Sequence, residues 1–179
     1  MAITYIASAI ASYSSTLSFT SGIDSSYNEY QFRYVNMHPS INQAWFSFQV
    51  NAAGQTGFNE VITSTAWRYY HNDTVDAYQG GGYRTDADQA QGTAYQPLTY
   101  ETGYDNDQAC SGMLTLYDPA STTYVKQFTA RTNDAQADDY TIDNHMAGYI
   151  NTTSAIDEIS FKFSTGNIDA GSIYMYGVG

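Results

Sequence analysis

Cysteine, proline and basic side chains are scarce in this chain of 179 residues. The single cysteine, Cys110, cannot form an internal disulfide, so a disulfide-stapled fold is excluded. Only six Lys and Arg oppose 18 Asp and Glu, and the formal net charge is -12. Because contacts to phosphate groups require Lys and Arg, neither nucleic acid nor an anionic membrane surface is an expected partner.

Long apolar runs are missing as well. No stretch approaches the roughly 18 apolar residues that a transmembrane helix requires. The first residues, Met1 to Ile6, lack the basic segment that opens a secretory signal. We therefore expect a protein that is made in the cytoplasm and is released by lysis rather than by secretion.

Aromatic residues, in contrast, are abundant, at 16% of the chain with 18 tyrosines. Tyr, Thr, Phe and Ile fit the pleated, half-buried surface of a strand, whereas good helix formers such as Leu, Lys and Glu are few. A chain of this length can bury about 70% of its unfolded surface, so it can fold as a single domain over residues 1–179. The composition predicts an all-β protein.

The alternation of apolar and polar residues is clearest near the C-terminus. Residues 159–163 alternate between apolar and polar side chains, and residues 172–178 alternate between apolar residues and tyrosine. A period of two places each apolar set on one face of a strand. The segment between them, residues 164–171, is rich in Gly, Asn and Asp, which favour turns. The pattern predicts a C-terminal hairpin on which the other strands are laid.

Shorter stretches with the same alternation are further strand candidates. Strands are predicted over residues 14–20, 30–35, 44–50, 58–70, 112–117, 124–131 and 141–150, and loops over residues 36–43 and 132–140. Residues 1–13 form either a weak strand or an N-terminal docking arm. Eight to ten short strands separated by turns are typical of a two-sheet β-sandwich, here of jelly-roll type.

Between residues 71 and 109 the strand pattern is lost, and the segment is rich in Tyr, Gly and Asp. A long structureless stretch inside a domain indicates either a binding or assembly loop or short strands that the pattern does not resolve. Tyrosine and tryptophan supply rigid contact area in binding loops. The candidate interface residues in and near this loop are Trp67, Tyr69, Tyr70, Tyr78, Tyr83, Tyr95, Tyr100 and Tyr104. The alternative is that these rings cap the open ends of the sandwich.

Motifs for catalysis and metal binding are weak. The three histidines lie in no zinc spacing, Cys110 has no signature of a thiol hydrolase, and no serine stands in a nucleophile elbow. We therefore expect no catalytic residues, no metal site and no cofactor. One alternative is calcium, because Asp105-Asn106-Asp107 is similar to the start of a calcium loop, although the glycine and the distal glutamate of that motif are missing. A second alternative is a glycan site, for which the best cluster is Trp67, Tyr69, Asn72 and Asp73.

Several segments together resemble a known family. They are Ser21–Tyr27, Tyr34–Pro39, Leu116–Pro119, Ala147–Tyr149, Asn151–Asp157 and Phe163–Ile173. In this order they resemble small structural proteins of tailed phages that infect marine bacteria, including cyanophages. The resemblance covers most of the chain and is most specific in the last segment, whereas residues 71–109 match only in character. It implies a non-enzymatic component of the virion with an all-β fold.

Together, the residues and the resemblance predict a structural protein on the outside of a phage particle. We expect a capsid decoration or cement subunit that binds copies of itself, as a trimer, and other virion proteins such as the major capsid protein or tail proteins. The alternative is a tail or fibre-tip protein with lectin-like binding to a host-surface glycan. An enzyme ranks third, because the motifs it needs are missing.

Overall fold

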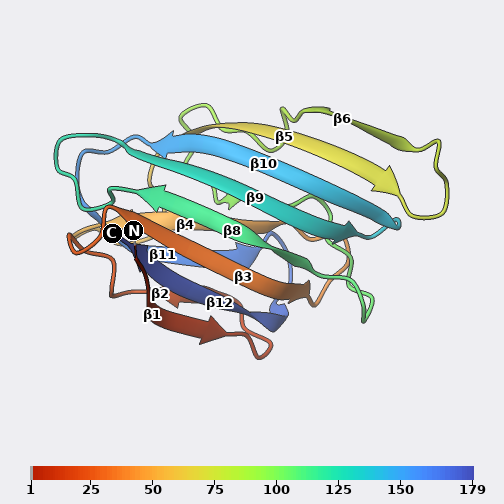
Figure 1. The fold of residues 1–179 in the computed structure, drawn as a ribbon, viewed down its shortest axis with the longest axis horizontal. Coiled ribbons are helices and arrows are strands. Elements are labelled where there is room, and N and C mark those ends of the chain that lie inside the picture. Colours follow the sequence, from red (N-terminus) through yellow and green to blue (C-terminus); the bar gives the residue numbers. More distant parts are fainter. Residues whose placement is uncertain (1) are drawn as a thin grey trace.

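The computed structural model describes residues 2–179, which form strands and turns without a helix. The strands are β1 (Ile3–Ile10), β2 (Leu17–Phe19), β3 (Glu29–Pro39), β4 (Phe46–Ala52), β5 (Ile62–Asn72), β6 (Gln79–Tyr83), β7 (Gln96–Pro97), β8 (Cys110–Tyr117), β9 (Lys126–Gln136), β10 (Tyr140–Ile150), β11 (Ile156–Phe163) and β12 (Ile168–Val178). They form two sheets in which every strand pairing is antiparallel (Figure 1). The expected all-β sandwich is confirmed.

Eight of the strands form a jelly roll. The large sheet contains the order β1-β12-β3-β8, and the small sheet has the order β2-β11-β4-β7. Each pairing joins an early strand to a late one: β1 to β12, β2 to β11, β3 to β8, and β4 to β7. A long antiparallel ribbon that is rolled into two sheets pairs early strands with late ones in this way. The jelly-roll type expected from the sequence is therefore confirmed.

Two hairpins are added to this jelly roll. The hairpin β5–β6 lies between β4 and β7 in the chain, and the hairpin β9–β10 lies between β8 and β11. Strand β9 pairs with β8, and β5 pairs with β10. The two hairpins therefore extend the large sheet to the order β1-β12-β3-β8-β9-β10-β5-β6. Figure 1 shows β8, β9, β10 and β5 side by side, with β6 at the far edge. We call β1, β12, β3 and β8 the jelly-roll half of the large sheet and the other four strands the added half.

The predicted C-terminal hairpin is wrong in its pairing. Both strands exist, but β11 belongs to the small sheet and β12 to the large one. The turn that joins them is shorter than expected, because β12 already begins at Ile168. Alternation identifies a strand and its buried face but not its partner. In a rolled ribbon, consecutive strands cross from one sheet to the other.

Two predicted loops are also partly wrong. The strand predicted over residues 58–70 is confirmed from Ile62 onward, where β5 begins. Residues 36–39 belong to β3, which continues through a register shift between Tyr34 and Met37. Asn36 has a φ of 52° there, as a bulge residue can. Residues 132–136 belong to β9, and only a tight turn with Asp139 at φ 62° separates it from β10.

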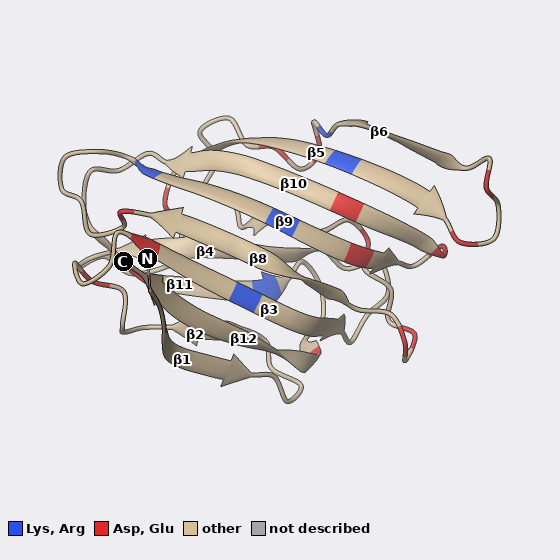
Figure 2. Ribbon diagram, in the orientation of Figure 1, with Lys and Arg blue, Asp and Glu red and all other residues tan. Residues whose placement is uncertain are grey.

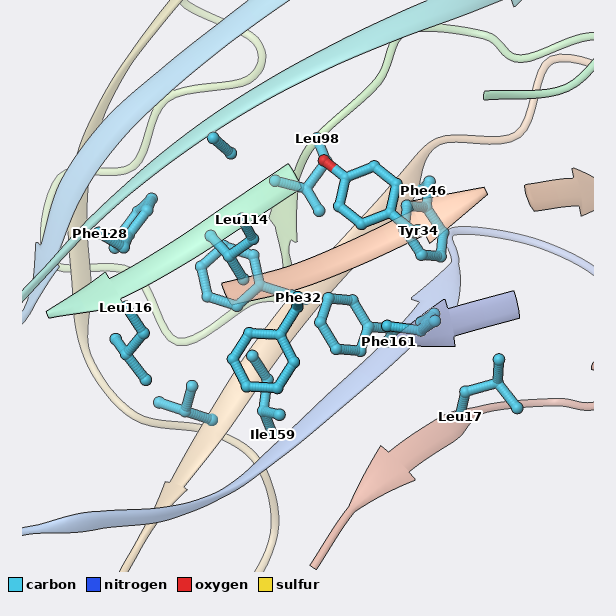
Figure 3. Close-up of a cluster of buried hydrophobic side chains, with 14 of the residues drawn as sticks. Leu17, Phe32, Tyr34, Phe46, Leu98, Leu114, Leu116, Phe128, Ile159 and Phe161 are labelled. Carbon is cyan, nitrogen blue, oxygen red and sulfur yellow. The ribbon is translucent and has the colours of Figure 1, made fainter. Parts of the chain in front are cut away.

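The core lies between the two sheets and extends beneath the added half (Figure 3). Phe161 of β11 packs against Phe32 of β3 and Phe46 of β4, with ring centroids 5.8 Å apart in both pairs. Phe48 of β4 packs edge-on against Phe128 of β9 at 5.1 Å. All five rings have at most 1% exposure. The apolar positions of the sequence alternation therefore face one another across the sandwich.

Residues 84–103 close the open side of the sandwich beside the added half. Ser64 of β5 donates its backbone N–H to the Gln89 carbonyl at 2.9 Å. Farther along, β7 pairs with β4 of the small sheet, and Thr102 bridges to both Ala44 and Gln136. This part of the predicted 71–109 loop region therefore packs against its own molecule.

The N-terminal residues also pack within the molecule. β1 pairs with β12 along the edge of the large sheet, and Ile6, Ala7 and Ala9 pack against the core. Ile3, Tyr5 and Ile10 remain exposed on the same strand. The segment considered as a docking arm is therefore an edge strand with an apolar exposed side.

Candidate functional site on the outer face of the large sheet

The outer face of the large sheet carries a row of aligned side chains that crosses all eight strands, and all of them except Ser8 on β1 are large. Successive pairings place one residue of each strand directly opposite the next. In the order of the strands the row contains Ser8, Tyr174, Arg33, Met113, Arg131, His145, Trp67 and Tyr83. Because paired residues share a face, these side chains form one continuous band. We call it the outer row.

A shallow groove runs beside the outer row on β5, β10, β9 and β8. Its volume is about 370 Å³, and Trp67, His145, Arg131 and Met113 contribute to its lining. Its floor consists of four smaller residues that face one another across the strands, namely Thr65, Ala147, Thr129 and Thr115. The groove therefore combines an aromatic and cationic wall with a floor that carries hydroxyl groups.

Charged side chains are concentrated in the middle of the outer row. The Arg131 guanidinium donates two hydrogen bonds to the Asp143 carboxylate, of 3.0 and 2.9 Å, and the Nε2 atom of His145 lies 3.0 Å from Asp143 Oδ2. The Arg131 hydrogen bonds hold the pKa of Asp143 below its ordinary value. Figure 2 shows the basic residue in the middle of β9 beside the acidic residue of β10. The paired charges make this part of the groove polar but nearly neutral.

Aromatic side chains dominate the β5–β6 end of the outer row. Trp67 packs edge-on against Tyr83 with ring centroids 5.6 Å apart, and Tyr69 packs edge-on against His145 at 6.2 Å. Trp67, Tyr69 and Tyr83 nevertheless stay 46%, 56% and 43% exposed. Rings that are fixed by neighbours and still open to solvent are suited to contact a partner.

The eight tyrosine and tryptophan residues expected to form an interface do not lie together. Trp67, Tyr69 and Tyr83 share the outer face, whereas Tyr70 and Tyr100 lie half-buried on the other side of the added half. Tyr100 is there in contact with two guanidinium groups, at 4.1 Å from Arg68 and 3.9 Å from Arg84.

The other three residues of this set are scattered. Tyr95 is half-buried beside Lys162, whose Nζ atom lies 4.2 Å from the ring centroid. Tyr78 and Tyr104 are exposed in turns on different parts of the chain. The structure thus brings three of the eight residues into one site and distributes the rest.

The expected glycan cluster is divided in the same way. Trp67 and Tyr69 lie on the outer face, but Asn72 is buried at the end of β5. Its Oδ1 atom accepts hydrogen bonds from the backbone of Thr74 and Val75 and so closes a turn. Asp73 follows in that turn and lines an acidic groove near Asp139. The groove beside Trp67 is instead completed by residues of β8, β9 and β10.

Sequence reasoning missed Met113, Arg131, Asp143 and His145. Arg131 and His145 stand at the polar positions of alternating strands, where a solvent-facing side chain is the default. The signal that could have found them is register, because both residues face Trp67 or its neighbour once β5, β10 and β9 are aligned. Register is not encoded in a single strand.

Other candidate groups form no second site. Cys110 is buried, and burial raises the pKa of its thiol, so the nucleophilic thiolate is disfavoured. Within residues 2–179, His, Cys, Asp and Glu side chains form no group of three or more that is placed to hold a metal ion. Asp105 and Asp107, the pair that is similar to a calcium loop, lie in the wall of the acidic groove with Asp73.

Comparison of the chain with protein-family models, curated proteins and solved structures gives no match in any of the three. The described part of the chain also contains no helix that is long and apolar enough to span a membrane.

Proposed function

We propose that this chain is a non-enzymatic structural protein on the exterior of a phage particle, most simply a capsid decoration or cement subunit. It is made in the host cytoplasm and binds other virion proteins and copies of itself, without nucleic acid, membrane or cofactor. The resemblance of several segments to structural proteins of tailed marine phages supports this role. The jelly roll fits it, because viral capsid and lectin domains both use this architecture.

The outer row is the observation that carries the proposal. Tyr, Trp, Met and Arg are the residue types enriched in protein interfaces, and the row presents all four on one broad sheet face. Trp67 and Met113 are exposed large apolar side chains in this row. A docking partner on the particle would cover them and gain the free energy of apolar burial.

Reconstitution on particles tests this role. We expect the chain in purified phage particles at a fixed ratio to the major capsid protein, as measured by quantitative mass spectrometry. Particles stripped of it should rebind the purified wild-type protein but bind Trp67→Ala at least about tenfold more weakly, because an exposed aromatic anchor is lost.

Tyr124→Ala is the matched control, because Tyr124 is also exposed, at 68%, but lies in the turn before β9. It should rebind like the wild type. A chain that is absent from particles, or equal binding by Trp67→Ala and Tyr124→Ala, would contradict the proposed docking face.

The groove favours a second candidate function, which is glycan binding by a tail or fibre-tip protein. Trp67 offers an aromatic wall, and Thr65 and Thr129 offer hydroxyl groups on the floor. An apolar surface beside a few hydrogen-bonding groups is typical of ligand sites. A glycan array separates the two functions: glycan binding that Trp67→Ala abolishes and Tyr124→Ala retains would favour the tip protein over the decoration subunit.

A further inference from the structure

The two edges of the large sheet differ in how they are protected. Strand β1 at one edge contains a bulge between Tyr5 and Ala7, which interrupts regular pairing. Strand β6 at the other edge reads Gln79-Gly80-Gly81-Gly82-Tyr83 and pairs with β5 without any shift of register. It contains no charge, no proline and no bulge, which are the devices that natural proteins use to prevent edge pairing.

Packing within the molecule explains two of the three glycines of β6, Gly80 and Gly81. A Cβ atom on Gly80 would lie 2.9 Å from the Tyr70 hydroxyl oxygen, and one on Gly81 would collide with the Tyr69 ring. The two rings therefore lie against β6 and hold this strand next to β5. Gly82 has open space at its Cβ position. The strand is thus fixed in place while its free edge stays uncovered.

Two hydrogen bonds at the ends of the β5–β6 pair show which backbone groups are free. Asn72 N donates to Tyr78 O, and Arg84 N donates to Ala66 O, both at 2.9 Å. In an antiparallel ladder, every second residue of a strand bonds to the neighbouring strand. Because Tyr78 and Arg84 bond to β5, Gly80 and Gly82 also direct their backbone N–H and C=O groups to β5. Residues Gln79, Gly81 and Tyr83 direct theirs to the open edge.

We infer that β6 is a dimer interface, at which β6 of a second copy of this chain pairs antiparallel about a two-fold axis at Gly81. In this register Gln79 faces Tyr83 of the second copy, and Gly81 faces its own counterpart. Each facing pair forms two hydrogen bonds, which use all the free edge groups of Gln79, Gly81 and Tyr83. The strand is self-complementary because these positions are symmetric about Gly81, and no like charges meet.

The surroundings of β6 support an added strand. Trp67 and Tyr83 are both exposed on the outer face next to the edge, so a second copy would bury apolar area there. The flanking turns carry acidic residues, of which Asp76 is fully exposed. Two copies would bring these carboxylates closer together, so the association should strengthen as salt screens them. The interface implies pairs in place of the expected trimer and does not depend on the proposed virion role.

Hydrogen exchange of the wild-type protein is the first test. Between about 1 µM and about 200 µM, the amides of Gln79, Gly81 and Tyr83 should become protected with increasing concentration. The amides of Gly80 and Gly82, which bond to β5, should be protected at both concentrations. Exchange at the three edge amides that is fast and independent of concentration would overturn the proposal.

Sedimentation velocity with a matched pair of variants is the second test. The wild type should form dimers, more strongly at high salt. Gln79→Pro removes a donor that the monomer does not use and should weaken the dimer about tenfold or more, whereas Gln79→Ala should behave like the wild type. A wild type that stays monomeric, or a dimer that Gln79→Pro leaves unchanged, would refute the interface. If Gln79→Pro unfolds, the exchange pattern of the wild type still decides.

Discussion

The two halves of the large sheet are covered on their inner face in different ways. The jelly-roll half is covered by the small sheet, and its inner side chains, such as Phe32 and Met175, meet other apolar groups. Residues 84–103 help to cover the added half, where buried polar residues meet: Ser64, Gln96, Thr99, Thr102, Thr132, Asp134 and Gln136. One half is therefore held by packing, and the other depends also on a network of hydrogen bonds.

The difference shows which side chains are needed where an irregular segment, and not a second sheet, covers a sheet. A second sheet satisfies its own backbone groups, so its inner side chains can all be apolar. An irregular segment has backbone groups without partners, and buried polar side chains must provide them. Gln96 does so, because its Nε2 atom donates to the Ala87 and Pro97 carbonyls and its Oε1 atom accepts from the Ser64 hydroxyl.

The largest expected effect is in the jelly-roll half. Phe161→Ala should lower the free energy of unfolding by about 3–5 kcal/mol, because it leaves a cavity among Phe32, Phe46 and Phe48. Chemical denaturation measures the change, and Phe161→Leu should recover most of it. A loss below about 1 kcal/mol would show that the core is not concentrated between the two sheets.

The next effect is dependent on pH and belongs to the added half. Asp134 is buried, and burial raises the pKa of its carboxyl to about 7. Because this folded-state pKa is above the unfolded value, the contribution of Asp134 is most favourable below about pH 4 and is lost as the pH rises to about 7. The loss amounts to about 4 kcal/mol at most.

Asp134→Asn tests this dependence, because the amide keeps the shape and stays neutral. The variant should be more stable than the wild type at pH 8, and its advantage should disappear near pH 4, as measured by denaturation at both values. A variant that is equally destabilised at both pH values would show that the ionised carboxylate is tolerated in the polar cover.

A smaller loss is expected at Gln96. Gln96→Ala should cost about 2 kcal/mol, because it leaves the Ser64 hydroxyl and the Ala87 carbonyl buried without this partner. Hydrogen exchange should show faster opening of residues 84–103, with the jelly-roll half unchanged. The control is Gln127→Ala, at an exposed position of β9. Uniform loss of protection across both halves would mean that they unfold as one unit.

The smallest effect is expected on the outer row. Arg131→Ala should leave the Tm within measurement error, because the Arg131 side chain is 72% exposed and its ion pair with Asp143 is hydrated. The same variant should weaken docking to phage particles if the outer row is the contact surface. A clear drop in Tm would instead give Arg131 a structural role.

Much of the fold could be predicted from the sequence, because alternation marks buried strand faces directly. The inward positions of β3, β4, β8 and β11 are all confirmed as core. Strand partners could not be predicted: Ile159 and Ile173 have the same pattern, yet they lie in different sheets. Pairing depends on contacts between residues that are distant in the chain, which a local pattern does not contain.

The candidate site was predictable only where residue type alone was informative. Trp67, Tyr69 and Tyr83 were found because they are aromatic, whereas Arg131 and His145 needed the register of three strands. For residues 71–109 the sequence left open a binding loop or short unresolved strands, and the short strands β6 and β7 lie there. The packing of residues 84–103 could not be predicted, because buried residues such as Gln96 and Thr102 are polar. Their burial depends on hydrogen-bond partners that only the folded structure provides.

The pairing of early strands with late strands has a consequence for synthesis on the ribosome. The β9–β10 hairpin can close as soon as it emerges, because Gln136 faces Tyr140. Strand β1 must wait until β12 has been synthesised, because Ile3 faces Val178. Loop closure over such a distance is slow, so β1 is among the last of these strands to find its partner. Until then, the nascent chain carries an unpaired apolar segment that chaperones can bind.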